Sequence, residues 1–451
     1  MQNILSEYYK TPLRSNVLGP SADLLNGAGF FRYGADLVCY GECSLGVAND
    51  VSNSSRFDVS KATTISNGEL RLPFDVGNVI ENLRRERYLK KFESEAKGIT
   101  HQRWIRACYY SVRELLPVWF RRHLQRAHLS DWKTLQFPHW PVDFTVDSLY
   151  EMLLRMTMIA QGCERVPFIW FWPGGASSCL VLTHDVETAT GRDFCSSVMD
   201  IDLSHGFRAS FQVVPEKRYE VPESYVNEVR TRGFELNIHD LNHDGHLFEE
   251  KAEFLRRAKK INEYVKKCGA HGFRAGAMYH NLDWYDAFEF SYDMSVANVA
   301  HLEPQRGGCC TVMPFFVGRI LEIPLTASED YSVFHILNDY SLELWKKQID
   351  LIQRRQGLLS FIIHPDYVIQ RRPRAVFESL LAHLRETCDR NGVWATLPGE
   401  VDRWWRARSE MKLIEDGSGY RIEGPESERA RVAYATLDGD RVVYSVERNS
   451  T

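Results

Sequence analysis

The chain has 451 residues, of which 44% are hydrophobic, and a formal net charge of −5. This length predicts one to three domains with a substantial buried core. The weak negative charge excludes a basic field for nucleic acid or an anionic membrane, and no apolar run has the length of an integral membrane segment. The ten cysteines lack paired CxxC spacing and the first residues, MQNILSEYYK, lack a signal-peptide pattern, so we expect a cytoplasmic protein with reduced thiols.

The first part of the chain reads as accessory structure. Residues 1–76 alternate short β-type runs with turns rich in Gly, Asn and Ser, which predicts a β-rich N-terminal module. Residues 77–175 predict a helical and aromatic connector that packs on the next domain. It contains an amphipathic helix around 105–119, which Pro117 kinks or breaks.

Residues 176–408 alternate strand-like and helix-like segments. The predicted strands span 179–187, 207–215, 234–240, 271–276, 290–297, 321–326, 358–365 and 393–397, and the clearest helices span 246–268, 342–356 and 374–390. This alternation favours a parallel sheet, and seven or eight strands in roughly 230 residues fit a distorted (β/α) barrel of the TIM type. Residues 409–451 predict a small C-terminal β unit of four short strands, with tight turns at DGSG and LDGD.

Polar residues follow several of the predicted barrel strands. The first strand ends in Thr-His-Asp-Val-Glu, and residues two apart in a strand share a face, so Asp185 and Glu187 should point the same way. His239 and His243 follow the third strand, Arg274 the fourth and His364 the seventh. Two carboxylates on one face suit a metal or acid/base site better than a core; the alternative is a charged strand end that turns into solvent.

These residue types can perform amide hydrolysis. One carboxylate and two neutral imidazoles form a catalytic type of metal-ligand set with open positions. A second carboxylate can accept a proton from water, and a protonated His364 can donate one to the leaving amine. Arg274 would orient the base and keep it ionised. The alternatives are a purely structural ion pair for Arg274 and a core histidine bonded to backbone for His364.

Residues 179–408 resemble the polysaccharide deacetylases, carbohydrate esterase family 4. The family motif Thr-Phe-Asp-Asp looks like Thr183 to Glu187, His-x-x-x-His matches His239 and His243, Arg-x-Pro looks like residues 274–276, and Leu-x-x-His looks like residues 361–364. The fourth motif, a Trp-lined wall, would fall at 323–326. The resemblance implies a distorted (β/α) barrel in which a divalent metal, held by a carboxylate and two histidines, supports hydrolysis of a sugar N-acetyl group.

Two residues depart from the family motifs. Val186 stands where many members have the metal-binding Asp, and Gly276 replaces the motif Pro. The resemblance makes Asp185 the base. We assign Glu187 to the metal because it shares the strand face and has the longer side chain; the alternative exchanges the two roles.

The sequence therefore predicts a metal-dependent carbohydrate N-deacetylase. The expected catalytic residues are Asp185, His364 and Arg274, and the expected metal ligands are Glu187, His239 and His243. Zn²⁺ is the expected metal, with other transition metals as alternatives. The expected cytoplasmic localisation favours a nucleotide-linked or lipid-linked N-acetylated sugar as the substrate over a cell-wall polymer. Sugar hydroxyls could contact polar residues near the strand ends, namely Asp240, Asp244, His246, His280 and Asp339.

Two other functions remain open from the sequence. The first is a different C–N amidohydrolase that uses the same barrel on a small non-sugar molecule. The second is a non-catalytic sugar-binding protein that has lost the metal.

Overall fold

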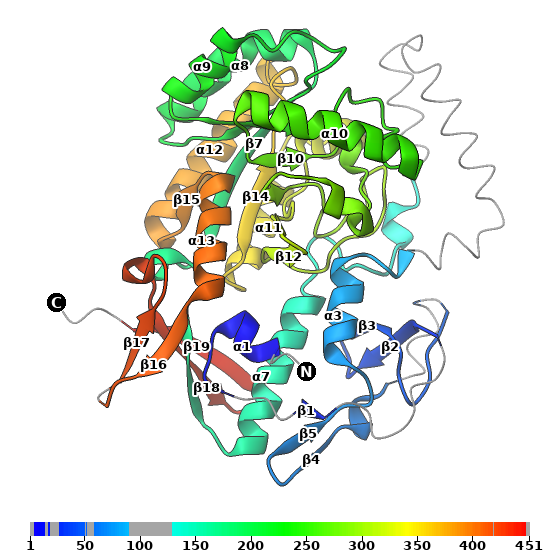
Figure 1. Cartoon of the computed structure of the whole chain (residues 1–451), viewed down its shortest axis with the longest axis vertical. Helices are drawn as coiled ribbons and strands as arrows, with labels where there is room; N and C mark the ends of the chain where they lie inside the picture. The colour runs from blue at the N-terminus through cyan, green and yellow to red at the C-terminus, as the bar shows by residue number, and fades with distance from the viewer. Residues whose placement is uncertain are drawn as a thin grey trace.

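A curled parallel sheet forms the centre of the molecule (Figure 1). The computed structural model describes residues 4–13, 17–18, 27–49, 51, 58–89, 129–417 and 419–447. The sheet runs in the order β12-β13-β11-β10-β9-β8-β7-β14, with β15 also paired to β7. Every pair is parallel except β12 with β13. This topology confirms the predicted α/β class and curled barrel-like sheet.

Each of the eight predicted strands overlaps a strand of this sheet. The observed bounds are β7 (Cys179–Val186), β8 (Ser210–Val213), β9 (Glu235–His239), β10 (Gly272–Arg274), β11 (Tyr292–Asp293), β13 (Ile320–Glu322), β14 (Leu358–Ile362) and β15 (Trp394–Thr396). The additional antiparallel strand is β12 (Phe315–Val317). An irregular segment after β13 reaches β14, because the backbone N–H of Ala327 donates to the carbonyl of Ser360 at 3.1 Å. The carboxyl ends of the parallel strands therefore meet at one end of the barrel.

Helices pack against the sheet through a common apolar core. They are α8 (Ala189–Ser204), α9 (Glu223–Thr231), α10 (Lys251–Cys268), α11 (Glu343–Gln353) and α12 (Arg371–Asn391). The last helix, α13 (Pro398–Glu410), packs instead in a second apolar core that includes the accessory regions. The predicted helix over 246–268 begins later than expected. Glu250 caps α10, since its carboxylate accepts hydrogen bonds from the backbone N–H groups of Ala252 and Glu253. Residues 240–250 are consequently a loop at the carboxyl end of β9.

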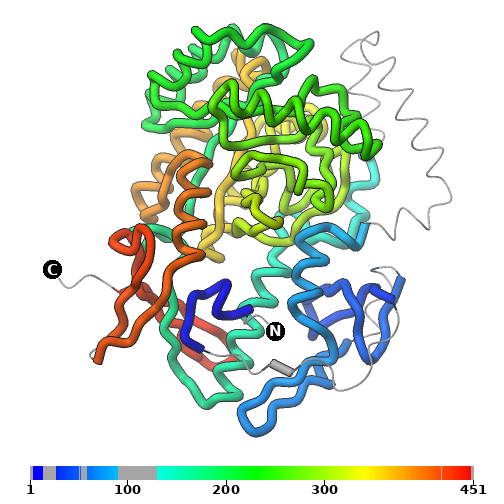
Figure 2. The backbone as a smooth tube through the Cα atoms, in the orientation of Figure 1, coloured from blue at the N-terminus to red at the C-terminus, as the bar shows by residue number. Residues whose placement is uncertain are grey.

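The N-terminal elements lie at the other end of the barrel (Figures 1 and 2). They are α1 (Ile4–Tyr9), β1 (Val17–Leu18), β2 (Gly29–Tyr33), β3 (Leu37–Gly41), β4 (Thr64–Ser66), β5 (Glu69–Arg71) and α3 (Val76–Arg84). The strands form a β2-β3 hairpin and a β1-β5-β4 sheet. The amphipathic helix predicted around 105–119 lies outside the described residues.

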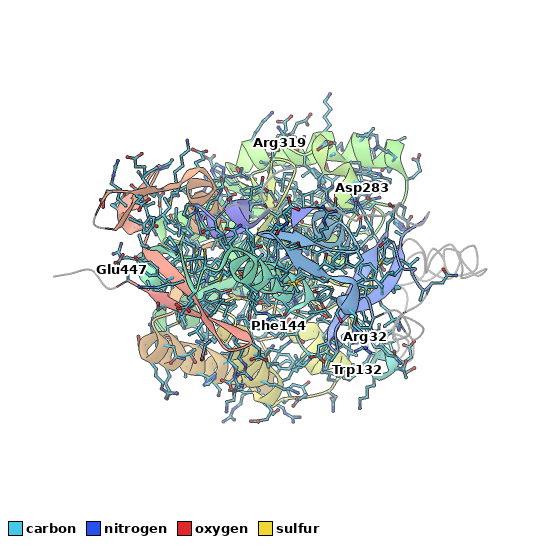
Figure 3. The ribbon with its side chains drawn as sticks, turned by 90° about the horizontal axis from the view of Figure 1, so that it is seen from below. Arg32, Trp132, Phe144, Asp283, Arg319 and Glu447 are labelled. Atoms are coloured by element: carbon cyan, nitrogen blue, oxygen red, sulfur yellow. The ribbon has the colours of Figure 1, made fainter. Side chains whose placement is uncertain are left out.

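The connector contributes a strand to the C-terminal sheet. After α7 (Thr145–Gln161), β6 (Arg165–Ile169) pairs with β18 (Val432–Asp438), which also pairs with β19 (Arg441–Val446); β16 (Lys412–Glu415) and β17 (Tyr420–Glu423) form a separate hairpin. The view from below shows Glu447, after β19, and Arg32, in β2, on opposite sides of the molecule (Figure 3). A second core joins both accessory regions and α7 to the lower end of the barrel.

No membrane-crossing helix occurs in the part of the chain that the structure describes, because none is both long and apolar enough.

Candidate active site

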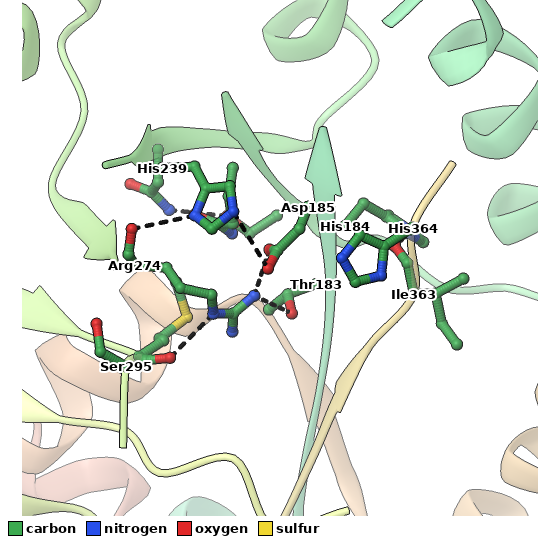
Figure 4. A network of polar contacts seen from close by, with 12 residues as sticks. Thr183, His184, Asp185, His239, Arg274, Ser295, Ile363 and His364 are labelled. Atoms are coloured by element: carbon green, nitrogen blue, oxygen red, sulfur yellow. Dashed lines mark hydrogen bonds and ion pairs between the residues drawn. The ribbon is translucent and has the colours of Figure 1, made fainter. Parts of the chain in front are cut away.

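The strand β7 presents alternate residues to opposite sides of the sheet (Figure 4). Asp185 points into the barrel, where its Oδ1 accepts a hydrogen bond from Arg274 Nη1 at 2.6 Å. His184 points the other way, with Nε2 2.9 Å from Asp202 Oδ2 and Nδ1 3.0 Å from the carbonyl oxygen of Ile363. The period of two expected from the sequence thus separates a site carboxylate from a buried structural His–Asp pair.

Arg274 lies in the interior of the barrel and donates hydrogen bonds to three residues. It is fully buried; besides Asp185, its Nη1 donates to Thr183 Oγ1 at 2.9 Å and its Nε donates to the carbonyl of Met294 at 2.9 Å. Burial by itself raises the pKa of Asp185, but the charge of Arg274, with His239 and His364, holds that pKa below its ordinary value. Asp185 is therefore a carboxylate at neutral pH, with one oxygen bound to Arg274.

Glu187 directly follows β7 and lies among three histidines. Its Oε1 is 2.9 Å from His243 Nε2, 3.7 Å from His239 Nε2 and 3.5 Å from His364 Nε2. One ligand atom each from Glu187, His239 and His243 lies within 4.8 Å of the others. Burial by itself raises the pKa of Glu187, but the charge of His243 and the contacts with the surrounding histidines lower it well below its ordinary value.

The ring of His239 is oriented by the backbone of the neighbouring strand. Its Nδ1 lies 3.1 Å from the carbonyl oxygen of Arg274, and a carbonyl can only accept, so Nδ1 carries the hydrogen. The lone pair of Nε2 then faces the site, where this buried nitrogen has no hydrogen-bond partner among the described residues. This is the arrangement of a metal-binding histidine, whose other nitrogen donates to a backbone carbonyl. Together with a carboxylate and a second imidazole, it fits a divalent metal with open coordination positions.

Gly276, where the family motif has Pro, packs closely against the loop after β9. A Cβ atom at this residue would lie 2.6 Å from Asp240 Oδ2 and 3.0 Å from His243 Cδ2. Asp240 and His243 also have left-handed backbones, with φ of +57° and +55°. A side chain at residue 276 would therefore force Asp240 or His243 to move, so Gly276 is packed tightly against the loop that carries His243.

His364 lies two residues beyond β14 and is held by Asp330. The ring Nδ1 donates to Asp330 Oδ1 at 2.6 Å, and the backbone N–H of His364 donates to Asp330 Oδ2 at 2.8 Å. Sequence analysis did not identify Asp330, which is 34 residues earlier, at the start of a short helical segment that continues to Ile336. The only signal was its location shortly after the sixth predicted strand.

The six residues predicted for the site come together at the carboxyl ends of four strands. Their roles stay a prediction. Among the other polar candidates, three have structural partners: Asp244 pairs with Arg257, His246 with Glu249, and His280 with Glu86 of the N-terminal region. Asp339 accepts a hydrogen bond from the backbone of Ser341 in a local turn. Residues 323–326, the expected wall, are buried and continue β13.

Comparisons with known proteins give distant structural neighbours. The sequence matches no known protein-family profile and no curated protein. A "putative polysaccharide deacetylase" from Mycobacterium smegmatis is 16% identical, with 53% of this chain and 93% of that chain covered and a TM-score of 0.42. Puue allantoinase is 12% identical, with 52% of this chain and 92% of that chain covered and a TM-score of 0.42. The peptidoglycan deacetylase PdaC from Bacillus subtilis is 13% identical, with 50% of this chain and 90% of that chain covered and a TM-score of 0.31. The structural neighbours of this chain thus include polysaccharide deacetylases of carbohydrate esterase family 4, at low identity and over about half of its length.

Proposed function

We propose that this protein is a metal-dependent hydrolase that removes the acetyl group from an N-acetylated sugar. The proposal rests on one observation: a Glu-His-His group, a carboxylate bound to arginine and a histidine bound to a carboxylate meet at the same end of a parallel sheet. This set can supply metal ligands, a general base and a general acid for amide hydrolysis. The motif resemblance to polysaccharide deacetylases supports an N-acetylated sugar as the substrate.

In this proposal Glu187, His239 and His243 hold the metal. Zn²⁺ is the first choice because zinc combines readily with imidazole and carboxylate in open catalytic sites. When bound, the metal would polarise the amide carbonyl and favour ionisation of water.

The remaining residues would move protons. Asp185 accepts a proton from the attacking water at Oδ2, because its Oδ1 is already bound to Arg274. His364 donates a proton from Nε2 to the leaving amine, while Asp330 holds the opposite side of the ring. Arg274 keeps Asp185 ionised and fixes its direction. The base and the acid thus come from different strands that border the same ligand group.

The test uses the purified full chain. We expect bound Zn²⁺ by elemental analysis, and release of acetate from an N-acetylated sugar, supplied free, nucleotide-linked or lipid-linked. Chelation should abolish release and added Zn²⁺ should restore it. Amine release only from a non-sugar amide would instead indicate another C–N amidohydrolase. Sugar binding by a chain without metal or turnover would indicate a non-catalytic sugar-binding protein. The cytoplasmic localisation of the protein remains a prediction.

A further inference from the structure

The loop after β8, residues 214–220, contacts both segments that carry the proposed metal ligands. On one side, the hydroxyl of Tyr219 donates to the carbonyl of Val186, the residue before Glu187. The same hydroxyl accepts a hydrogen bond from the backbone N–H of Val214 at 2.9 Å. The hydroxyl therefore ties the end of β7 to the end of β8, immediately beside the ligand Glu187.

The neighbouring residue, Arg218, contacts the histidine loop on the other side. Its Nη2 donates to the carbonyl of His243 at 2.7 Å and its Nε donates to the carbonyl of Asn242 at 3.4 Å. The backbone N–H of Glu216 adds a hydrogen bond to the carbonyl of Leu241 at 3.0 Å. Two consecutive side chains of one loop thus bind the backbone next to Glu187 and the backbone of His243.

Arg218 contacts His243 at a residue whose backbone has an unfavourable conformation. The φ angle of His243 is +55°, in the left-handed region that residues other than glycine adopt only when surrounding contacts hold them there. Arg218 bonds to the carbonyl of that same residue. Both side-chain hydrogen bonds of Arg218 go to this loop, and no carboxylate pairs with Arg218 in the described part of the chain.

We propose that Arg218 and Tyr219 are positioning residues that set the separation of Glu187 and His243 and thereby the metal affinity of the site. This inference rests on the proposed function, because it requires Glu187, His239 and His243 to bind a metal. Residues that orient metal ligands from outside typically change metal affinity by about 10- to 100-fold when they are replaced.

The experiment measures the Zn²⁺ affinity of the full chain by competition with a chromophoric chelator, and the visible absorption of the Co²⁺-loaded chain. Arg218→Met keeps the length of the side chain but removes its donors, and Tyr219→Phe removes one hydroxyl. We expect Zn²⁺ affinity to fall about 10- to 100-fold in Arg218→Met and about tenfold in Tyr219→Phe. Both Co²⁺ spectra should change, and Arg218→Lys should recover part of the lost affinity.

Arg230→Met is the matched control. Arg230 also donates to backbone carbonyls, those of Cys268 and Gly269, but at the amino ends of the strands. Its Zn²⁺ affinity and Co²⁺ spectrum should equal those of the natural chain. If the substitutions acted only through stability, the unfolding temperature would fall in the control and in the test variants alike. The Zn²⁺ affinity of the test variants would then not differ from that of the control.

The outcomes separate the two proposals. If the natural chain and Arg230→Met both fail to bind Zn²⁺, the proposed function is wrong. If the natural chain binds Zn²⁺ and Arg218→Met and Tyr219→Phe bind it with unchanged affinity and spectra, the positioning role is wrong and the metal site stands. If Arg218→Met does not fold, Tyr219→Phe decides, because it deletes a single oxygen atom.

Discussion

Asp330 binds His364 at two points, the ring Nδ1 at 2.6 Å and the backbone N–H at 2.8 Å. Asp330 is fully buried, so this contact fixes both the position and the rotation of the imidazole. Burial by itself lowers the pKa of His364, but the charge and hydrogen bond of Asp330, with a contribution from Glu187, raise it well above its ordinary value. The pair therefore keeps the ring protonated, as a proton donor requires.

Replacing Asp330 should change the pH dependence of turnover. Asp330→Asn removes the charge that stabilises the imidazolium, so the pKa of His364 should fall and kcat should decline at a lower pH on the alkaline side. His364→Ala should lower kcat about 100-fold or more with metal content unchanged. Asp339→Asn is the control, since Asp339 bonds within a local turn. If kcat of Asp330→Asn declined at the same alkaline pH as kcat of the natural chain, the role of this pair would be refuted.

The two histidines on the β9 side should be required for tight metal binding. His239→Ala and His243→Ala each remove one of the three proposed ligands, so elemental analysis should find the metal lost while circular dichroism shows an intact fold. His246→Ala tests the specificity of the effect, because His246 lies in the same loop but pairs with Glu249. Full metal occupancy in a chain lacking both His239 and His243 would exclude this ligand set.

The two carboxylates of the first barrel strand should have different roles. Glu187 is 2.9 Å from His243 Nε2, whereas Asp185 comes no closer than 3.8 Å to His239 Nε2 and is bound to Arg274. Glu187→Gln should weaken metal binding, with activity partly restored by excess Zn²⁺. Asp185→Asn should keep the metal and lose most turnover. Metal loss from Asp185→Asn instead would exchange the two assignments.

A side chain at residue 276 should disturb the histidine loop. In Gly276→Ala, the new Cβ meets Asp240 Oδ2 at 2.6 Å, so Asp240 or His243 must move. We expect weaker Zn²⁺ binding and a loss of about 1–3 kcal/mol in the free energy of unfolding, typical of overpacking. Gly419→Ala is the control, because a Cβ there meets nothing within 4 Å. Equal Zn²⁺ affinity in both variants would contradict this account of the glycine.

A partly buried carboxyl at the other end of the barrel, that of Glu235, should make stability depend on pH. Burial raises the pKa of Glu235 from 4.5 to about 7, despite hydrogen bonds from Asn237 and the backbone of Gly399. Between these two pH values the folded chain holds more protons than the unfolded chain, so the free energy of unfolding falls as the pH rises.

Glu235→Gln should remove this contribution. Relative to the variant, the natural chain should lose roughly 2 kcal/mol between pH 4.5 and 7, less than the full shift implies because Glu235 keeps some contact with water. Urea unfolding of both chains across this range measures the difference. Parallel stability curves would show that Glu235 does not titrate in this way.

The sequence by itself determined the strands and helices of the barrel. It also determined which side chains of the first barrel strand face the barrel interior. Strand-like runs and helical stripes are local patterns, and each of the eight predicted strands overlaps an observed one. The alternation of β7 is also local, which is why Asp185 could be assigned to the barrel interior and His184 to the opposite face. Bounds were less exact where a cap decides them, as at Glu250 before α10.

Only the tertiary structure decided the contacts between distant loops. Asp330 and His364 are 34 residues apart, and Arg218 reaches His243 across 25 residues, so no local period relates either pair. β6 joins the C-terminal sheet although the sequence placed it in a connector, because its partner β18 lies more than 260 residues later. Gly276 packs closely against the carboxylate of Asp240 and the ring of His243, which come from another strand end. The alternation of residues within a strand is local, so the sequence predicts which side chains share a face. The packing of one loop on another depends instead on how the whole sheet places the two loops in space.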